Sequence, residues 1–232
     1  MARKRSFVRK CLRFLLLTVL AVVGVVVLTL LLFRFVNPPS SAFMLAYQFG
    51  SDPQPLRHQW VPYNEISPWM PLAVIASEDQ RFAHHRGVDM AAIRKAVSEY
   101  RAGEGLRGAS TITQQTAKNL FLWNGRSFIR KAIEAVLALG IDALWPKERV
   151  LEVYLNVAEF GPGVYGVEAA SQFYFGKPAR QLSRIQAARL AAVLPNPKVL
   201  SVNSPSAYVQ ERVNWIGRQM AQLSGLEYLE QL

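Results

Sequence analysis

The order of apolar and polar positions divides the chain into one long apolar segment and a remainder patterned mainly as helices. Residues 14–33 form a run of 20 residues without a charge. A helix needs about 20 apolar residues to cross a hydrocarbon core roughly 30 Å thick. The pattern therefore predicts one transmembrane helix over residues 14–34. A tail over 1–13 precedes it, and a connector over 35–61, containing Asn37-Pro38-Pro39, follows it.

Residues 62–232 are predicted to form one mainly α domain. Residues 70–76 are all apolar and predict a buried helix, with Ser67 as its N-cap, Pro68 as its first residue and Glu78 at its end. Hydrophobic periodicity predicts further helices over 90–100, 110–119, 128–144, 146–156, 164–175, 183–194 and 208–223.

Capping residues support several of these helix starts. Asp89 is the expected cap of the helix over 90–100, and Ser127 is the expected cap of the helix over 128–144. Thr111 with Gln114 fits a capping box at the start of the helix over 110–119. The helix over 128–144 is expected to bury one apolar stripe. That stripe consists of Ile129, Ile133, Val136, Leu137 and Leu144.

Two segments have no regular pattern. Residues 103–108 contain three glycines, which predicts a mobile loop of the kind that often covers a site. Residues 42–50 are short, apolar and aromatic, and they either pack on the domain or lie along a membrane face.

Charge sharpens the membrane prediction. The formal net charge is +11, and six basic residues lie within the first 13 positions, which contain no acid. The positive-inside tendency then keeps the N-terminus in the cytoplasm and exports the rest of the chain. A cleaved signal peptide is the alternative, with Ser40-Ser41-Ala42 as its cleavage site, but its apolar region would be only about 7–15 residues long. The single cysteine, Cys11, lies in the tail, so the exported part is expected to fold without a disulfide.

The densest group of ionisable residues follows the predicted buried helix. Glu78 and Asp79 stand side by side at its end, and a carboxylate in such a place is a candidate general base. The alternative is that Glu78 pairs with Arg81 or a loop amide. His84 and His85 are candidate metal ligands, but a histidine that holds the loop by hydrogen bonds is the simpler interpretation.

A second carboxylate lies in a basic setting. Arg130 is four residues before Glu134, so the two share a helix face, and Arg126 and Lys131 are near in sequence. Enzymes that act at an anomeric carbon commonly use two carboxyl groups. The alternative is a solvated surface ion pair.

Residues 108–119 begin with a glycine and are rich in hydroxyl and amide groups. The start of a helix offers unpaired N–H groups that suit phosphate, and Gln114 and Lys118 lie on one face. The alternative is plain capping and a polar surface. Glu152 and Asn156, further along, could equally be surface residues.

In this order the segments resemble the peptidoglycan glycosyltransferases. The matching motifs are Glu-Asp-x-x-Phe-x-x-His-x-Gly (78–87), Gly-Ala-Ser-Thr-Ile-Thr-Gln-Gln (108–115), Arg-Lys-x-x-Glu (130–134), Lys-x-x-x-Leu-Glu-x-Tyr-Leu-Asn (147–156), and Gly-Val-Glu-Ala-Ala (166–170) followed by Tyr-Phe-Gly-Lys (174–177). The stand-alone, monofunctional form is the better match, because there is no Ser-x-x-Lys motif of a partner transpeptidase domain. The implied fold is mainly α and lysozyme-like, with a small membrane-proximal lobe.

The resemblance implies a polymerisation in which a lipid-linked disaccharide-pentapeptide (lipid II) attacks a growing lipid-linked glycan chain. A β-1,4 bond forms with inversion and undecaprenyl pyrophosphate leaves. Glu78 would be the general base, and Glu134 would assist near the pyrophosphate. The residues that would neutralise phosphate charge are Lys118, Arg126, Arg130 and Lys131.

The resemblance also implies a set of supporting residues. Those that shape the loop of Glu78 are Asp79, Phe82 and His85; those that position sugar and phosphate are Ser110, Thr111, Gln114 and Gln115; Asn119, Glu152 and Asn156 complete the expected substrate-binding set. The loop over 103–108 would gate the acceptor. A divalent cation, Mg²⁺ or another, is an expected option near Glu134, although no metal motif marks it, and no organic cofactor is expected.

The expected setting is the bacterial inner membrane, with a single span and the catalytic domain in the periplasm. Expected partners are the lipid substrates, the membrane, and proteins of cell-wall synthesis and division; nucleic acid is not expected. Two alternatives are retained. One is a membrane-anchored, lysozyme-like peptidoglycan hydrolase, and the other is a non-enzymatic scaffold for wall assembly.

Overall fold

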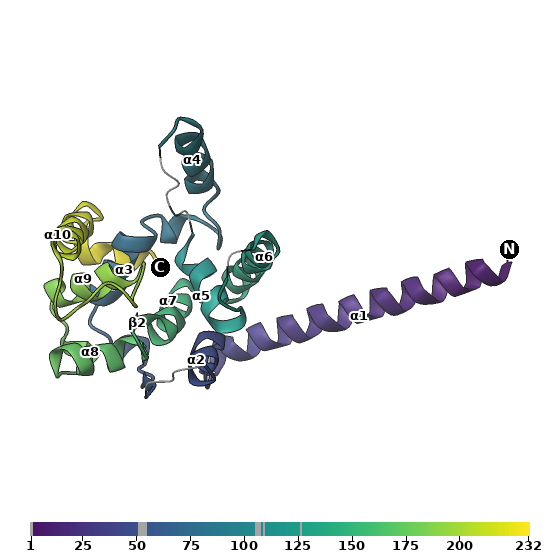
Figure 1. Cartoon of the computed structure of the whole chain (residues 1–232), viewed down its shortest axis with the longest axis horizontal. Coiled ribbons are helices and arrows are strands. Elements are labelled where there is room, and N and C mark those ends of the chain that lie inside the picture. The colour runs from purple at the N-terminus through teal and green to yellow at the C-terminus, as the bar shows by residue number, and fades with distance from the viewer. Residues whose placement is uncertain (1, 51–54, 105–107, 109, 126) are drawn as a thin grey trace. The chain divides into compact units, whose positions relative to one another are not determined.

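The computed structural model describes the chain except for residues 1, 51–54, 105–107, 109 and 126, with side chains described from residue 9 onward (Figure 1). The chain forms two compact units, Met1–Pro38 and Pro39–Leu232. The first unit contains α1 (Ala2–Phe35). Its residues 9–35 are long and apolar enough to cross a membrane, which confirms the predicted apolar helix. The hydroxyls of Thr18 and Thr29 donate to carbonyls one turn earlier, at 2.9 and 2.8 Å, so the few polar side chains of the span satisfy themselves within the helix.

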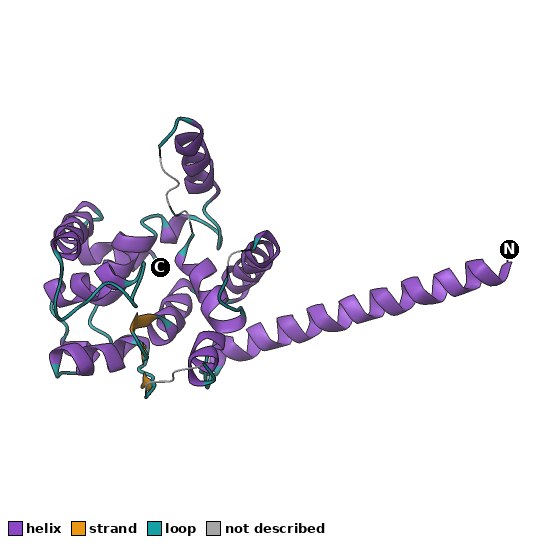
Figure 2. Cartoon of the chain, in the orientation of Figure 1, coloured by secondary structure: helices purple, strands orange, loops and turns teal. Residues whose placement is uncertain are grey.

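The second unit consists of helices and one small sheet in the part that the structure describes (Figure 2). Its α-helices are α2 (Ala42–Gln48), α3 (Trp69–Glu78), α4 (Met90–Arg101), α5 (Ile112–Phe121), α6 (Phe128–Leu144), α7 (Lys147–Val157), α8 (Val167–Phe175), α9 (Arg184–Val193) and α10 (Ala207–Gln222). Short 3-10 helices are η1 (Tyr63–Glu65), η2 (Phe82–His84), η3 (Ala179–Gln181) and η4 (Gly225–Gln231). The strands are β1 (Arg57–His58), β2 (Glu159–Gly161) and β3 (Val164–Tyr165).

The centre of this unit is α3. Residues 70–76 are buried, and α9 and α10 pack against the helix, so the predicted buried helix and its end at Glu78 are confirmed. The predicted N-cap is wrong. Pro68 occupies that position, because the Ser67 hydroxyl donates instead to the Leu182 carbonyl at 2.7 Å. The start of α3 is therefore held by a tertiary contact and not by a local cap.

A second centre is α5, which contacts α2, α6 and α7. Its predicted capping box is present, with the Thr111 hydroxyl accepting from the Gln114 backbone and the Gln114 side chain accepting from the Thr111 backbone. The caps predicted at Asp89 and Ser127 are present as well. The contact of α2 with α5 shows that residues 42–48 pack on the domain.

The buried face of α6 differs from the predicted stripe. Its buried residues are Glu134, Ala138 and Ile141, whereas Ile129 is 75% exposed and Val136 is 68% exposed. Ile133 is exposed too, and Leu137 and Leu144 are only partly buried. The most apolar side of α6 is exposed, because its buried side holds Glu134 with its ion-pair partners Arg130 and Lys131.

The sheet was not predicted, and it corrects the helix expected over 164–175. Val164 and Tyr165 form β3, which pairs in parallel with β1 and antiparallel with β2. The helix begins only at Val167, after Gly166 with φ of +83°. A Cβ atom at Gly166 would lie 2.8 Å from the Asn156 carbonyl oxygen, so the turn between strand and helix requires glycine.

Helix α4 stands away from the other helices of the unit (Figure 1). Ala96 is its one buried residue, and the apolar residues Met90, Val97 and Tyr100 are exposed. The predicted loop over 103–108 follows α4, and its residues 105–107 lie outside the described part of the chain.

Candidate active site

Glu78 is the last residue of α3, and neutral groups hydrogen-bond both of its carboxylate oxygens. The Ser77 hydroxyl donates to Oε1 at 2.9 Å, and the Gln115 side-chain amide donates to Oε2 at 3.0 Å. The Gln115 amide is itself oriented by the Tyr154 hydroxyl, which donates to its oxygen at 3.0 Å. Burial raises the pKa of Tyr154, and Glu78 and Asp79 raise it further, so the phenol keeps its proton and acts as a donor.

Arg212 of α10 lies close to Glu78 and Ser77. Its guanidinium donates to the Ser77 hydroxyl at 3.1 Å and lies 3.9 Å from Glu78 Oε1. Its Nε–H donates to the carbonyl of Ala192 in α9 at 3.2 Å. Sequence reasoning missed Arg212, Tyr154 and the role of Ser77, because they come from distant or unremarkable positions. Glu78 does not pair with Arg81, which contacts Asp89 instead at 3.4 Å.

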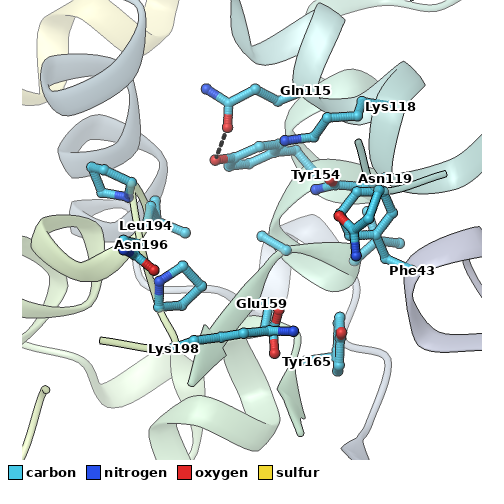
Figure 3. A pocket seen from close by; sticks show the side chains of 15 residues that line it. Phe43, Gln115, Lys118, Asn119, Tyr154, Glu159, Tyr165, Leu194, Asn196 and Lys198 are labelled. Atoms are coloured by element: carbon cyan, nitrogen blue, oxygen red, sulfur yellow. Dashed lines mark hydrogen bonds between the residues drawn. The ribbon is translucent and has the colours of Figure 1, made fainter. Parts of the chain in front are cut away.

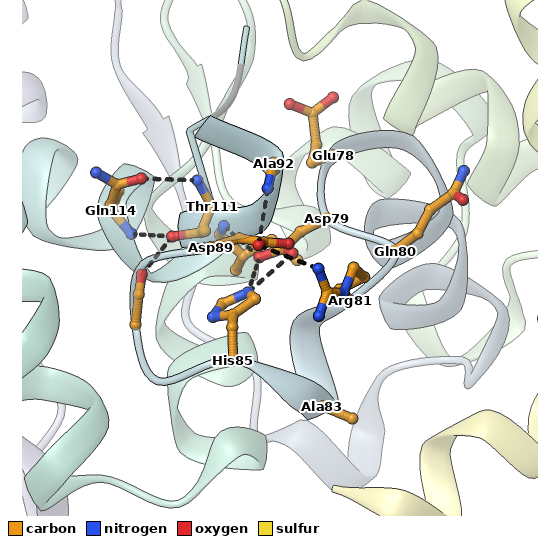
Figure 4. A network of polar contacts seen from close by, with 12 residues as sticks. Glu78, Asp79, Gln80, Arg81, Ala83, His85, Asp89, Ala92, Thr111 and Gln114 are labelled. Atoms are coloured by element: carbon orange, nitrogen blue, oxygen red, sulfur yellow. Dashed lines mark hydrogen bonds and ion pairs between the residues drawn. The ribbon is translucent and has the colours of Figure 1, made fainter. Parts of the chain in front are cut away.

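Asp79 and His85 belong to a network of polar contacts next to Glu78 (Figure 4). His85 Nε2 lies 2.9 Å from both carboxylate oxygens of Asp79, and Asp79 Oδ2 also accepts from the backbone N–H of Ile112 at 3.0 Å. The Thr111 hydroxyl donates to the Gly87 carbonyl at 2.5 Å. These bonds tie the loop after α3 to the start of α5, while the Glu78 side chain points away from them.

Phe82 and His85 of the loop both contact Lys147, the first residue of α7. Phe82 is fully buried, and the Lys147 ammonium lies 4.6 Å from its ring centroid. That ammonium also donates to the His85 carbonyl at 2.7 Å and contacts Asp142 at 2.6 Å. The interpretation of His85 as a loop-holding histidine agrees with these contacts.

Glu134 forms a second, buried charged cluster. Its side chain is 2% exposed, and Arg130 donates to Oε2 at 2.9 Å while Lys131 contacts Oε1. The Lys131 ammonium also donates to the Ser110 hydroxyl at 2.7 Å. The alternative of a solvated ion pair is therefore wrong. Arg126, predicted to belong to this cluster, lies outside the described residues.

Lys118 of α5 lies in the electric field of both carboxylates. Burial lowers its pKa, Glu134 raises it, Arg130 and Lys131 lower it, and Glu78 raises it. Its ammonium lies 5.5 Å from the ring centroid of Phe43 in α2. A partly desolvated cation of this kind binds an anion strongly, because little water has to be displaced from it.

The residues around Glu134 do not readily fit a protein-bound divalent cation. Both carboxylate oxygens already contact a cationic side chain, so a metal ion would have to displace Arg130 or Lys131. Within the described part of the chain, no three His, Cys, Asp or Glu residues come together as metal ligands. We derive no step through a metal ion.

Two cavities lie at this site, one lined by Glu78 and the other by its partner Gln115. One, of about 230 Å³, is lined by Glu78, Asp79, Ser110 and Thr111 among others. The other, of about 200 Å³, is lined by residues that include Gln115, Lys118, Asn119 and Tyr154. The hydrogen bond between Glu78 and Gln115 therefore joins the linings of the two cavities.

The second cavity is polar on both sides. Figure 3 shows Gln115 and Lys118 on one side and Glu159 and Lys198 on the other. Burial raises the pKa of Glu159, and the charge of Lys198 opposes this rise. Amides, a phenol, a carboxyl group and ammonium groups around one cavity suit a ligand that is rich in hydroxyls, amides and negative charge.

Glu152 and Asn156, also predicted as substrate-binding, lie in a different contact network. The Asn156 side chain accepts from the Val61 backbone at 2.8 Å and donates to its carbonyl at 2.9 Å. Glu152 accepts from the Trp60 ring at 3.3 Å and pairs with Arg149 at 3.1 Å. In this structure both hold residues 60–61 on α7.

The other predicted site residues fall into two groups. The first group lies along α3, α5 and α6 and consists of Glu78, Gln115, Lys118, Asn119, Ser110, Arg130, Lys131 and Glu134. The second group is buried and consists of Asp79, Phe82, His85, Thr111 and Gln114. The first group combines an accessible carboxylate with a cluster of cations, which suits a proton transfer beside an anionic leaving group.

Comparisons with known proteins point in one direction. Residues 45–221 match the family described as "Transglycosylase". A protein of Marinomonas sp. named "Biosynthetic peptidoglycan transglycosylase" is 58% identical over 204 residues, which cover 88% of each chain. Proteins of the same name are 52% identical over 98% of this chain and 99% of theirs in Chromohalobacter salexigens, and 55% identical over 98% and 93% in Pasteurella multocida.

Proposed function

Because the chain belongs to the transglycosylase family, we propose that this peptidoglycan glycosyltransferase polymerises lipid-linked disaccharide-pentapeptide into β-1,4-linked glycan strands. The acceptor is one molecule of this lipid II, and the donor is the growing chain on undecaprenyl pyrophosphate. The observation that carries the proposal is the placement of Glu78. Glu78 lines a cavity, accepts hydrogen bonds from two neutral donors, and interacts with Lys118, which also interacts with Arg130 and Lys131.

Glu78 acts as the general base. Its carboxylate takes the proton of the acceptor 4-hydroxyl as that oxygen attacks the anomeric carbon of the donor. The bond from this carbon to the pyrophosphate oxygen breaks, and its electron pair leaves with the phosphate. The attack comes from the side opposite the leaving group, so an α-linked donor becomes a β-linked product.

The cationic cluster stabilises the leaving pyrophosphate. Lys118, Arg130 and Lys131 surround the place where negative charge increases, and Arg126 is proposed to join them. Glu134 balances Arg130 and Lys131 and keeps their side chains in place through its two contacts. In this proposal Glu134 orients cations and does not itself exchange a proton.

The membrane explains two apolar features, each within its own unit. Residues 9–35 can span a bilayer, and α6 exposes Phe128, Ile129 and Val136. Both proposed substrates are lipids, so a protein anchored in their membrane meets them at high local concentration. We place the N-terminus in the cytoplasm and the domain in the periplasm on the basis of the basic tail.

A polymerisation assay tests this function. Detergent-solubilised full-length protein is incubated with labelled lipid-linked disaccharide-pentapeptide, and the products are separated on a gel beside those of Glu78→Gln. We expect a ladder of long, lysozyme-sensitive chains from the wild type only. Degradation of finished peptidoglycan without synthesis would favour the hydrolase alternative, which the cationic cluster disfavours because neutral glycan cleavage releases no pyrophosphate. Neither activity would favour the scaffold.

A further inference from the structure

We propose that Arg212 of α10 is the positioning residue of the general base, acting on Glu78 through the Ser77 hydroxyl and through its own charge. The inference rests on the proposed function, in which Glu78 accepts the proton. It assigns a role in the reaction to α10, a helix that carries none of the motifs on which the resemblance was based.

The contacts of the guanidinium restrict Arg212 to one orientation. Its Nε–H is bound to the carbonyl of Ala192 at 3.2 Å, and a terminal N–H is bound to Ser77 Oγ at 3.1 Å. A guanidinium is planar and holds its donors at fixed angles. Two bonds to two different helices, α9 and α3, therefore determine where the charge lies relative to Glu78.

Arg212 also determines the direction of the Ser77 hydroxyl. An arginine can only donate, so Ser77 Oγ must use a lone pair to accept from it. The single hydroxyl proton of Ser77 is then directed at Glu78 Oε1, 2.9 Å away. Without the guanidinium, the hydroxyl could rotate and donate its proton elsewhere, and Glu78 would lose one of the two donors that hold its carboxylate.

The charge of Arg212 acts on Glu78 without a direct hydrogen bond to it. The distance of 3.9 Å to Oε1 is too long for a direct hydrogen bond, so the oxygen keeps a lone pair for the acceptor proton. A cation at this distance still attracts the carboxylate and helps to fix its position. The other charged or titratable groups that interact electrostatically with Glu78 are Lys118 from α5 and Tyr154 from α7. Asp79 follows Glu78 in the chain, but its carboxylate is bound to His85. Arg212 donates to Ser77 and lies 3.9 Å from Glu78 Oε1, so it is the cation that contacts the Ser77–Glu78 pair.

The simpler interpretation is that Arg212 only stabilises the packing of α10 against α9 and α3. Apolar packing already joins these helices, since Ile216 and Met220 of α10 are fully buried. A residue that only joins the helices would affect the free energy of unfolding, whereas a positioning residue affects kcat more than KM. The two interpretations can therefore be separated by experiment.

The test uses the full-length protein in detergent with lipid-linked disaccharide-pentapeptide, and it compares Arg212→Gln, Arg212→Lys and the matched control Arg218→Gln. Arg218 lies on the same helix and is exposed. We expect Arg212→Gln to lower kcat by about 10- to 100-fold, a part of what a general base contributes, with KM changed less than about 3-fold. Arg218→Gln should match the wild type.

The lysine variant separates charge from geometry. Arg212→Lys keeps a cation on α10 but changes the shape of the donor group. An ammonium lacks the rigid fork that reaches both Ala192 and Ser77, so kcat should lie between those of the wild type and Arg212→Gln. The double variant Ser77→Ala, Arg212→Gln should lose less kcat than the product of the two single fold-losses, because both changes disrupt the same hydrogen bond.

Thermal unfolding of each variant completes the test. An Arg212→Gln protein that melts at a lower temperature, but keeps the wild-type kcat and KM at a temperature where it is folded, would show that Arg212 only joins the helices and would overturn the inference. Glu78→Gln, assayed alongside, tells this failure from that of the proposed function. If Glu78→Gln polymerises normally, both fail; if only Glu78→Gln is inactive, the inference about Arg212 alone fails.

Discussion

Glu78 and Glu134 are both carboxylates beside the same lysine, but their surroundings differ. Glu78 ends a helix, is 13% exposed, and receives its hydrogen bonds from a hydroxyl and a side-chain amide. Glu134 lies inside α6, is 2% exposed, and has both oxygens bound to cationic side chains. Lys118 lies within the electrostatic reach of each of them.

The difference shows how one site can separate proton transfer from charge compensation. A carboxylate held by neutral donors keeps its negative charge available for an incoming proton. A carboxylate bound to two cations has its charge already balanced, and protonation would break those contacts. The structure therefore favours Glu78 as the base and Glu134 as the residue that holds the cations.

The strongest test of this comparison is Glu78→Gln. We expect polymerisation to fall by about 10²–10⁴-fold. The free energy of unfolding should change by less than about 1 kcal/mol, because the one ion pair that is lost is the long, 3.9 Å contact with the partly exposed Arg212. Turnover of lipid-linked precursor and thermal melting measure the two effects, with the exposed Glu148→Gln as the control. Near-normal turnover would remove Glu78 from the role of base.

Glu134→Gln should lower stability more, and activity less, than Glu78→Gln. Removing the charge leaves Arg130 and Lys131 without their partner, so we expect a loss of about 1–3 kcal/mol in unfolding free energy. A fall of roughly 10- to 100-fold in kcat/KM should accompany it, because the cations lose their positions. Melting and steady-state kinetics measure both.

A matched control for this change is Glu99→Gln in α4. Glu99 pairs with Lys95 four residues away at 3.8 Å, and the Lys95 side chain is 75% exposed. Exposed helical pairs contribute only about 0.3–0.5 kcal/mol, so this variant should change little. Equal effects at positions 99 and 134 would contradict the contrast between buried and exposed pairs.

Lys118→Ala tests the cation that faces both carboxylates. We expect affinity for the lipid-linked pyrophosphate to fall about 10-fold near neutral pH, with Lys95→Ala as the exposed control. Because burial lowers the pKa of Lys118, its charge should be lost at a lower pH than for an ordinary lysine, and wild-type binding should weaken as pH rises through that range. Lys118→Arg, which keeps its charge, should move this alkaline loss to higher pH. An unchanged affinity in Lys118→Ala would place the phosphate elsewhere.

The smallest effect is expected for Tyr154→Phe. The change removes the hydroxyl that orients Gln115, and Gln115 still reaches Glu78, so kcat should fall only about 3- to 10-fold, in line with one neutral hydrogen bond of about 1 kcal/mol. Tyr174→Phe is the control, because its hydroxyl donates to the Phe160 carbonyl at 3.2 Å in another part of the domain. A loss as large as that of Glu78→Gln would mean that Tyr154 does more than orient Gln115.

Local sequence determined much of the framework. The apolar run of α1, the buried run of α3, and the caps at Asp89, Thr111 and Ser127 are each set by residues within a few positions of one another. Interactions of this range leave a readable spacing, which is why these elements were predicted. The order of short motifs indicated the family for the same reason.

Only the tertiary structure decided which groups surround Glu78. Ser77 is adjacent in the chain, but Gln115, Tyr154 and Arg212 come from α5, α7 and α10, and no spacing links them to α3. The apolar periodicity of α6 showed that the helix has an apolar face, but not which face would be covered. Periodicity reports an energetic preference of one segment, whereas burial and long-range hydrogen bonds depend on where the other segments pack, and folding the whole domain decides that.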